Sequence, residues 1–280
     1  IRAFRDARLP IRVRLIRWSI PNASGLNYAE WDTVDAHPAP MVAVYGRNWV
    51  LDGTYIERNA LQRAASAGSP GWWGRLNFPV DTMRAILAAA LRPGAAQLHL
   101  HIVGDSTAEL VLSQMHALAP DSAWRARRVR FEHGAITTDS QIARALRLGL
   151  VISQPRATAR LRTWHKAGIP LAYGSDGLRN PFYNVMVAIT GGPQHTEALS
   201  REDAVTMYTR GAAYAEFAER EKGTIAPGML ADVAVLSQDI FTIPPQALPG
   251  TTSVLSIVGG RIVRDELTKA AISSVPHLDQ

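Results

Sequence analysis

The sequence predicts an α/β protein, built as an incomplete (β/α)8 barrel of about six βα units with a small C-terminal β module. Two observations indicate this class. From residue 79 onward, short apolar segments alternate with helical patterns, which is typical of βαβ units and a parallel sheet. After residue 221 the pattern changes to short strands between glycine- and proline-containing turns. We therefore expect a partial barrel over residues 1–221, part of a small β-sandwich over residues 222–265, and a tail over residues 266–280.

The first two strands are predicted over residues 11–20 and 41–51. In the first, arginine alternates with valine, leucine and isoleucine, as in a strand with one polar face. The second is an apolar and aromatic run that ends at the turn signal Asp52-Gly53. Small and apolar residues at helical spacing then predict a helix over residues 57–67. A loop follows over residues 68–79, where glycine and proline recur.

The repeating part of the chain begins at residue 80. Strands are predicted over residues 97–103, 128–132, 150–154 and 170–174. Helices are predicted over residues 80–91, 107–118, 139–148, 157–167 and 201–214. Thr138 and Ser200 stand where N-caps of two of these helices are expected. Strands of the β module are predicted over residues 231–236, 254–258 and 261–263, with a hairpin turn at Gly259-Gly260.

The polar residues at the predicted strand ends favour a barrel over an open doubly wound sheet, which six strands could also build. These residues are His101, His133, Gln154 and Asp176. In a barrel the carboxyl ends of the strands converge on one mouth, whereas in an open sheet they are spread along an edge.

Composition limits the function classes. The net charge is +6, but only Lys166, Lys222 and Lys269 are lysines, and the arginines are scattered among acids, so we expect no nucleic-acid partner. There is no cysteine, which excludes disulfides, thiolate metal sites and a cysteine nucleophile. No apolar run approaches membrane-spanning length, and we expect a soluble, cytoplasmic protein with no membrane partner. The chain starts at Ile1, and we expect it to be a fragment of a longer protein.

Two imidazoles and a carboxylate at separate strand ends predict a divalent metal site formed by His101, His133 and Asp176, because histidine nitrogen and carboxylate oxygen are common ligands of such ions. A single histidine in a strand is more often a structural residue, but three such residues at equivalent places argue against coincidence. His99 lies two residues deeper on the same face of its strand, and we expect a supporting or core role for it.

Asp176 has two candidate roles: it could bind the metal alone, or also act as a general base toward water. A structural alternative is a helix cap in a tight turn. The sequence contains no GxSxG, no GxxxxGK[ST] and no HExxH motif. A barrel without metal, in which Asp176 and His133 form an acid/base pair, as in an isomerase, is a further alternative.

At these residues the chain resembles the amidohydrolase superfamily of metal-dependent hydrolases, and most closely its amidohydrolase-3 branch of YtcJ-like and N-substituted formamide deformylase-like proteins. The matching motifs are His-Ile-Val-Gly-Asp at residues 101–105, Phe-Glu-His-Gly at 131–134, Gly-Ser-Asp at 174–176, and the segment at 223–236 that contains Pro-Gly and Ala-Asp. The resemblance implies hydrolysis of C–N bonds other than peptide bonds, in an amide, formamide or cyclic amide (the EC 3.5 class), with a small-molecule substrate.

The chain also departs from this superfamily. The His-x-His that normally ends the first barrel strand is absent, because His99-Leu-His101 belongs to a later strand. Asn48 stands where many two-metal relatives have a carboxylated lysine. We therefore expect one zinc-like ion rather than a lysine-bridged pair. The alternative is a catalytically incomplete remnant that acts as a structural or binding module. A homo-oligomer is compatible with either interpretation.

Overall fold

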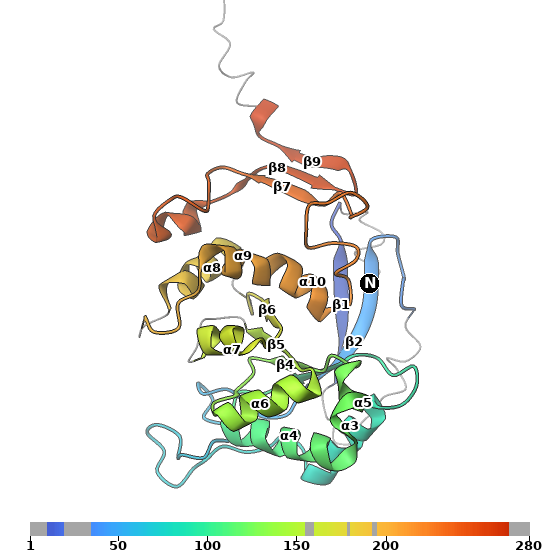
Figure 1. The fold of residues 1–280 in the computed structure, drawn as a ribbon, viewed down its shortest axis with the longest axis vertical. Helices are drawn as coiled ribbons and strands as arrows, with labels where there is room; N and C mark the ends of the chain where they lie inside the picture. Colours follow the sequence, from blue (N-terminus) through green and yellow to red (C-terminus); the bar gives the residue numbers. More distant parts are fainter. Residues whose placement is uncertain (1–9, 20–34, 155–159, 178–179, 192–194, 269–280) are drawn as a thin grey trace, which may run out of the picture.

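Within the part of the chain that the structure describes, six parallel strands form the main sheet (Figure 1). The computed structural model describes residues 10–19, 35–154, 160–177, 180–191 and 195–268. The strands are β1 (Val13–Ser19), β2 (Val42–Val50), β3 (Leu98–His101), β4 (Arg130–Glu132), β5 (Val151–Gln154) and β6 (Leu171–Tyr173). Their spatial order is β1-β2-β3-β4-β5-β6, without the reversal of strand order that defines a doubly wound sheet. The sheet is therefore an incomplete barrel, as predicted.

Helices follow the strands along the chain. They are α3 (Val80–Ala90), α4 (Asp105–Leu118), α5 (Asp121–Arg125), α6 (Asp139–Leu148), α7 (Leu161–Ala167), α8 (Pro181–Thr190), α9 (Arg201–Thr206) and α10 (Ala212–Ala215), with the π-helical turn η2 (Met207–Gly211) joining the last two. The N-cap predicted at Thr138 is present at the start of α6, where it forms a capping box: the side chains of Thr138 and Gln141 bond each other's backbone N–H groups. The Ser200 side chain likewise accepts a hydrogen bond from the N–H of Asp203.

The helix predicted over residues 57–67 is wrong, since this segment forms turns, bends and irregular chain. Its backbone groups bond elsewhere: the N–H of Leu61 donates to Asp52, and the N–H of Gln62 donates to the carbonyl of Trp73. The carbonyl of Leu61 lies where a side chain on Gly104 would have to be. Tertiary contacts have replaced the local hydrogen bonds that a helix needs.

Two helices, α5 and α8, were not predicted. Helix α8 has clear local signals: the Asn180 side chain accepts from the N–H groups of Phe182 and Tyr183, and Pro181 occupies the first turn. The predicted strand end at Gln154 is present, but its side chain lies outside the described residues. No helix in the described ranges is long and apolar enough to cross a membrane.

The C-terminal part contains a second, antiparallel sheet, drawn in orange and red in Figure 1. Its strands are β7 (Val233–Leu236), β8 (Ser253–Val258) and β9 (Arg261–Asp265), with the short 3-10 helix η3 (Pro245–Gly250) before β8. Gly259 and Gly260 both have positive φ, at 57° and 76°, as a tight two-residue hairpin requires. Arg12, next to the start of β1, pairs with Asp232 at 2.7 Å and joins the two sheets.

The core lies between the barrel sheet and its helices. Leu100, Phe131 and Ile152 occupy successive strands and are completely buried. Because side chains alternate along a strand, their neighbours His99, His101, Arg130 and Glu132 face the opposite side, the barrel interior. The face toward the helices is therefore apolar, and the face toward the barrel interior carries polar and ionisable side chains.

Arg128 connects the start of β4 to the end of α10. Its guanidinium donates to both carboxylate oxygens of Glu219, at 2.6 and 3.0 Å, and to the carbonyl of Tyr214 at 2.8 Å. It also lies over the rings of Tyr214 and Phe217, at 3.8 and 4.4 Å from their centroids. The Arg128 hydrogen bond is the main reason that the pKa of Glu219 is lowered below its ordinary 4.5.

We expect Arg128→Met to lower the free energy of unfolding by about 2–3 kcal/mol at pH 7, because charge-assisted hydrogen bonds and cation–π contacts are both lost. A carboxylate with a lowered folded-state pKa stabilises above its unfolded pKa, and this contribution is lost as pH falls through the folded value. The difference between wild type and variant in urea denaturation should therefore shrink below about pH 4.5. Arg147→Met is the control: its exposed pair with Asp121 should contribute less than about 1 kcal/mol. A pH-independent difference would contradict the expectation.

Candidate active site

A pocket of about 320 Å³ opens on the interior face of the barrel sheet. We call it the histidine pocket. Its lining comes from all six strands or the residues that follow them: Ile16, Trp18, Asn48, His99, His101, Arg130, Glu132, His133, Ser153, Gly174 and Asp176. The three predicted site residues therefore border one cavity, although 75 positions separate the first from the last (101 to 176).

His101 and His133 are in direct contact. Their rings meet edge to face, with centroids 4.6 Å apart and an interplanar angle of 82°. Nδ1 of His101 is buried and has no hydrogen-bond partner among the described residues. A buried imidazole nitrogen without a partner is costly in a folded protein unless something else binds it.

Backbone strain accompanies two of the predicted site residues. His133 has φ of 70° and is followed by Gly134 at 62°; Asp176 has φ of 42° and is followed by Gly177 at 89°. Positive φ is uncommon for residues with a side chain, and where it persists it often marks a functional site. At both positions this left-handed turn directs the chain away from the strand end, and the N–H of His133 still bonds the carbonyl of Ser153 at 2.8 Å.

Asp176 borders the pocket and is exposed. Among the described residues, no three histidine, aspartate or glutamate side chains lie close enough to hold a metal ion by themselves. The structure thus brings His101 and His133 together and places Asp176 in the same pocket. The ligand set itself stays a prediction.

The same pocket contains a second set of polar side chains, which we call the lower layer: Asn48, His99, Arg130 and Glu132. Nη2 of Arg130 is 2.8 Å from Oε1 of Glu132, and Nδ1 of His99 is 3.5 Å from the same oxygen. The strand register explains the grouping, since His99 is paired with Asn48 on one side and Arg130 on the other.

The lower layer contains one anion and one permanent cation. Burial by itself would raise the pKa of Glu132, but His99, the charge of Arg130 and Ser153 together outweigh it and lower the pKa below 4.5. Burial also lowers the pKa of His99 below 6.5, despite the opposing effect of Glu132, so this ring is neutral at pH 7. Burial raises the pKa of Tyr45 to about 12. Its phenol, which accepts a hydrogen bond from Arg130, therefore stays protonated.

Gly46 makes room for His99. It lies in β2 where the pairing with β1 shifts register, and its φ is 65°. A Cβ atom at this position would be 2.6 Å from Nε2 of His99. This nitrogen is also 3.3 Å from Oε1 of Gln97, whose amide donates to the carbonyls of Arg128 and Ala215. The ring is therefore fixed on both sides.

Asp52 supports the loop that follows His101. Its buried carboxylate accepts hydrogen bonds from the N–H groups of Val103 and Gly104 at 2.9 and 2.8 Å, and from Thr107 Oγ1 at 2.7 Å. Burial raises its pKa above 3.8, although these donors act in the opposite direction. From the sequence, Asp52 was interpreted only as a turn residue.

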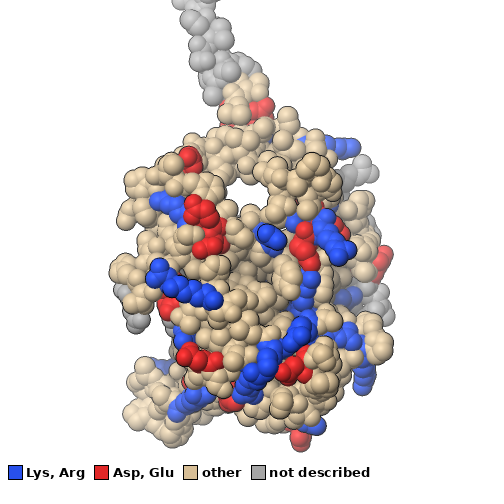
Figure 2. Space-filling view, in the orientation of Figure 1, with Lys and Arg blue, Asp and Glu red and all other residues tan. Residues whose placement is uncertain are grey.

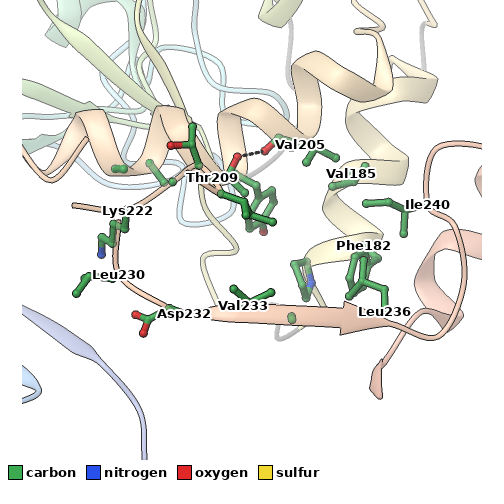
Figure 3. Close-up of a pocket in the computed structure, with 18 of the residues that line it drawn as sticks. Phe182, Val185, Val205, Thr209, Lys222, Leu230, Asp232, Val233, Leu236 and Ile240 are labelled. Carbon is green, nitrogen blue, oxygen red and sulfur yellow. Dashed lines mark hydrogen bonds between the residues drawn. The ribbon is translucent and has the colours of Figure 1, made fainter. Parts of the chain in front are cut away.

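A larger cavity of about 660 Å³ lies between the small sheet and helices α8 to α10, where Figure 2 shows an opening (Figure 3). Its walls are mostly apolar and include Phe182, Val185, Leu236 and Ile240. Its charged residues are already paired, Lys222 with Glu216 and Asp232 with Arg12. The described side chains lining it include no histidine, so the smaller pocket is the better candidate for chemistry.

Sequence reasoning missed several pocket residues. Arg130, Glu132, Ser153 and Trp18 were not selected, although period-two alternation along each strand places them on the face of the histidines. Trp72 and Trp73, in the loop over residues 68–79, are absent from the residues lining this pocket. The indole of Trp72 instead donates to the carbonyl of Arg58, within its own loop.

Comparison with known proteins assigns the family. Residues 16–264 match the model Amidohydro_3, described as the Amidohydrolase family. The chain belongs to this family. The match covers the whole barrel sheet except the start of β1, together with nearly all of the small sheet. The resemblance inferred from the strand-end motifs is confirmed.

This amidohydrolase-family chain is 25% identical over 268 residues to "Putative amidohydrolase YtcJ" of Bacillus subtilis (strain 168), covering 84% of this chain and 50% of that protein. It thus spans about half the length of that relative. The fold is similar to that of an uncharacterized metal-dependent hydrolase from Pyrococcus horikoshii OT3, with a TM-score of 0.65, 19% identity, and coverage of 78% of this chain and 49% of the other. It is also similar to a mutant of the atrazine chlorohydrolase TrzN from Arthrobacter aurescens TC1 complexed with zinc and atraton, with a TM-score of 0.61, 17% identity, and coverage of 98% and 64%.

Proposed function

We propose that the histidine pocket is the active site of a metal-dependent hydrolase that cleaves C–N bonds other than peptide bonds, in an amide, formamide or cyclic amide. One observation carries the proposal: His101 and His133 are in ring contact at the edge of a pocket that also contains Asp176. The family assignment supports a hydrolase. A pocket of about 320 Å³ suits a small molecule rather than a polymer.

The residues of the pocket fit a divalent ion such as zinc. His101 and His133 would bind it, Asp176 is the predicted third ligand, and the unpartnered Nδ1 of His101 is the observation that favours a bound cation. Zinc is named in the TrzN complex, a structurally similar protein. When bound, such an ion polarises a carbonyl and makes water more acidic.

Side chains of this chain would carry out proton transfer and substrate binding. Asp176 would accept the proton of the attacking water and return it to the leaving nitrogen. Ile16 and Trp18 form the apolar part of the pocket lining and would seat an apolar part of the substrate. Glu132 is held by Arg130 and is the less available carboxylate.

Removal of metal tests the proposal. The protein purified with zinc should hydrolyse N-formyl or N-acyl amines; dialysis against a chelator should abolish the rate, and added Zn²⁺ should restore it. Amine release, followed for each state, is the measurement. Activity that survives chelation would favour an acid/base pair of Asp176 and His133 without metal, and the absence of any rate in the zinc-loaded protein would contradict a hydrolase.

A second candidate is a catalytically incomplete chain that serves as a structural or binding module. It is favoured by the absence, among the described residues, of three side chains close enough to bind a metal by themselves. A zinc titration of this chain separates the two. Tight binding at a fixed ratio supports the hydrolase, and no binding supports the module.

A further inference from the structure

The lower layer of the histidine pocket contains a permanent positive charge next to its carboxylate. We propose, resting on the function proposed above, that the pocket takes a single divalent ion because the guanidinium of Arg130 occupies the place of a second one. This inference concerns the number of ions and the role of Arg130, and a hydrolase with two ions would contradict it without contradicting the proposed function.

The lower layer contains side chains of the kinds that a second ion would use as donors. Two-metal hydrolases hold their ions about 3.5–4 Å apart, between shared and flanking donors. Nδ1 of His99 and Oε1 of Glu132 are 3.5 Å apart, close enough to share an ion. Oδ1 of Asn48 is buried and has no hydrogen-bond partner among the described residues. The chemistry of the donors alone would therefore permit a second cation.

Arg130 prevents it. Its Nη2 is 2.8 Å from the oxygen of Glu132 that such an ion would need. Arginine stays protonated in proteins, so this charge persists at every working pH. Only 11% of the Arg130 side chain is exposed, and repulsion between it and a divalent ion is strong where water is largely excluded. An ion bound beside His101 and His133 avoids this direct competition for Glu132.

Metal stoichiometry tests the inference. Each variant is loaded with excess Zn²⁺, freed of unbound metal by gel filtration, and its zinc-to-protein ratio is measured by mass spectrometry of the metal. Wild type should hold one ion, and Arg130→Met should hold two. Arg130→Lys, which keeps the charge, should return the ratio to one, and so should Arg130→Met combined with Glu132→Gln, which removes the second ion's carboxylate. Arg84→Met, an exposed position on α3, should leave the ratio at one.

The measured zinc ratios distinguish failure of this inference from failure of the proposed function. Two ions in wild type, or one ion in a folded Arg130→Met variant, would overturn the inference alone. A wild-type protein that binds no zinc would overturn both the inference and the proposed function. Should Arg130→Met fail to fold, Glu132→Gln provides the second test, because it leaves the Arg130 charge uncompensated. Its zinc affinity, measured by calorimetry, should fall by about 10-fold or more, and an unchanged affinity would contradict the inference.

Discussion

Replacement of Asp176 by asparagine is expected to lower kcat for amide hydrolysis by about 10²- to 10⁴-fold, the usual contribution of a general acid/base. Asparagine has nearly the same shape, but its amide cannot take a proton from water. Asp176 borders the pocket and is exposed, and the Asp176→Asn variant should therefore fold like wild type. The measurement is the steady-state rate on an N-formyl amine, with KM determined separately.

The control for this prediction is Asp81→Asn, at an exposed position in the first turn of α3. Its rate should equal that of wild type. If Asp176→Asn retained full activity, Asp176 would be a turn residue, as its positive φ and the following Gly177 also allow. Glu132 would then be the remaining carboxylate in the pocket and the next to replace.

Replacement of Asp52 by alanine should lower the free energy of unfolding by about 3–5 kcal/mol, because several buried donors that share this one acceptor would be left unsatisfied, at about 1–3 kcal/mol each. The N–H groups of Val103 and Gly104 and the hydroxyl of Thr107 would lose their acceptor in a region that water does not reach. Asp52→Asn should cost less, about 1–3 kcal/mol, because an amide oxygen can still accept from some of these donors. Urea denaturation monitored by circular dichroism gives both values.

Asp81→Ala serves as the control here too and should cost less than about 1 kcal/mol. The Asp52 variants should also weaken zinc binding, because the loop that Asp52 holds begins directly after His101. A stable Asp52→Ala variant would show that the loop is held mainly by its apolar contacts, such as the buried side chain of Ile102.

The barrel could be predicted because each βα unit carries its own local signal. Period-two and helical hydrophobic patterns gave the strands, and capping residues such as Thr138 gave helix starts. The loop over residues 57–67 could not be predicted in this way. Its conformation depends on Asp52 and Gly104, whose contacts are made by tertiary structure rather than by neighbours in the chain.

The sequence by itself determined the family, the parallel barrel sheet and the placing of His101, His133 and Asp176 at strand ends, because these features follow from residue type and spacing. Only the tertiary structure decided which side chains meet. Strand register placed Arg130 beside His99 and Glu132 beside His101, and the bulge at Gly46 gave the His99 ring its space. Register and bulges are set by packing between distant segments, and no local pattern encodes them.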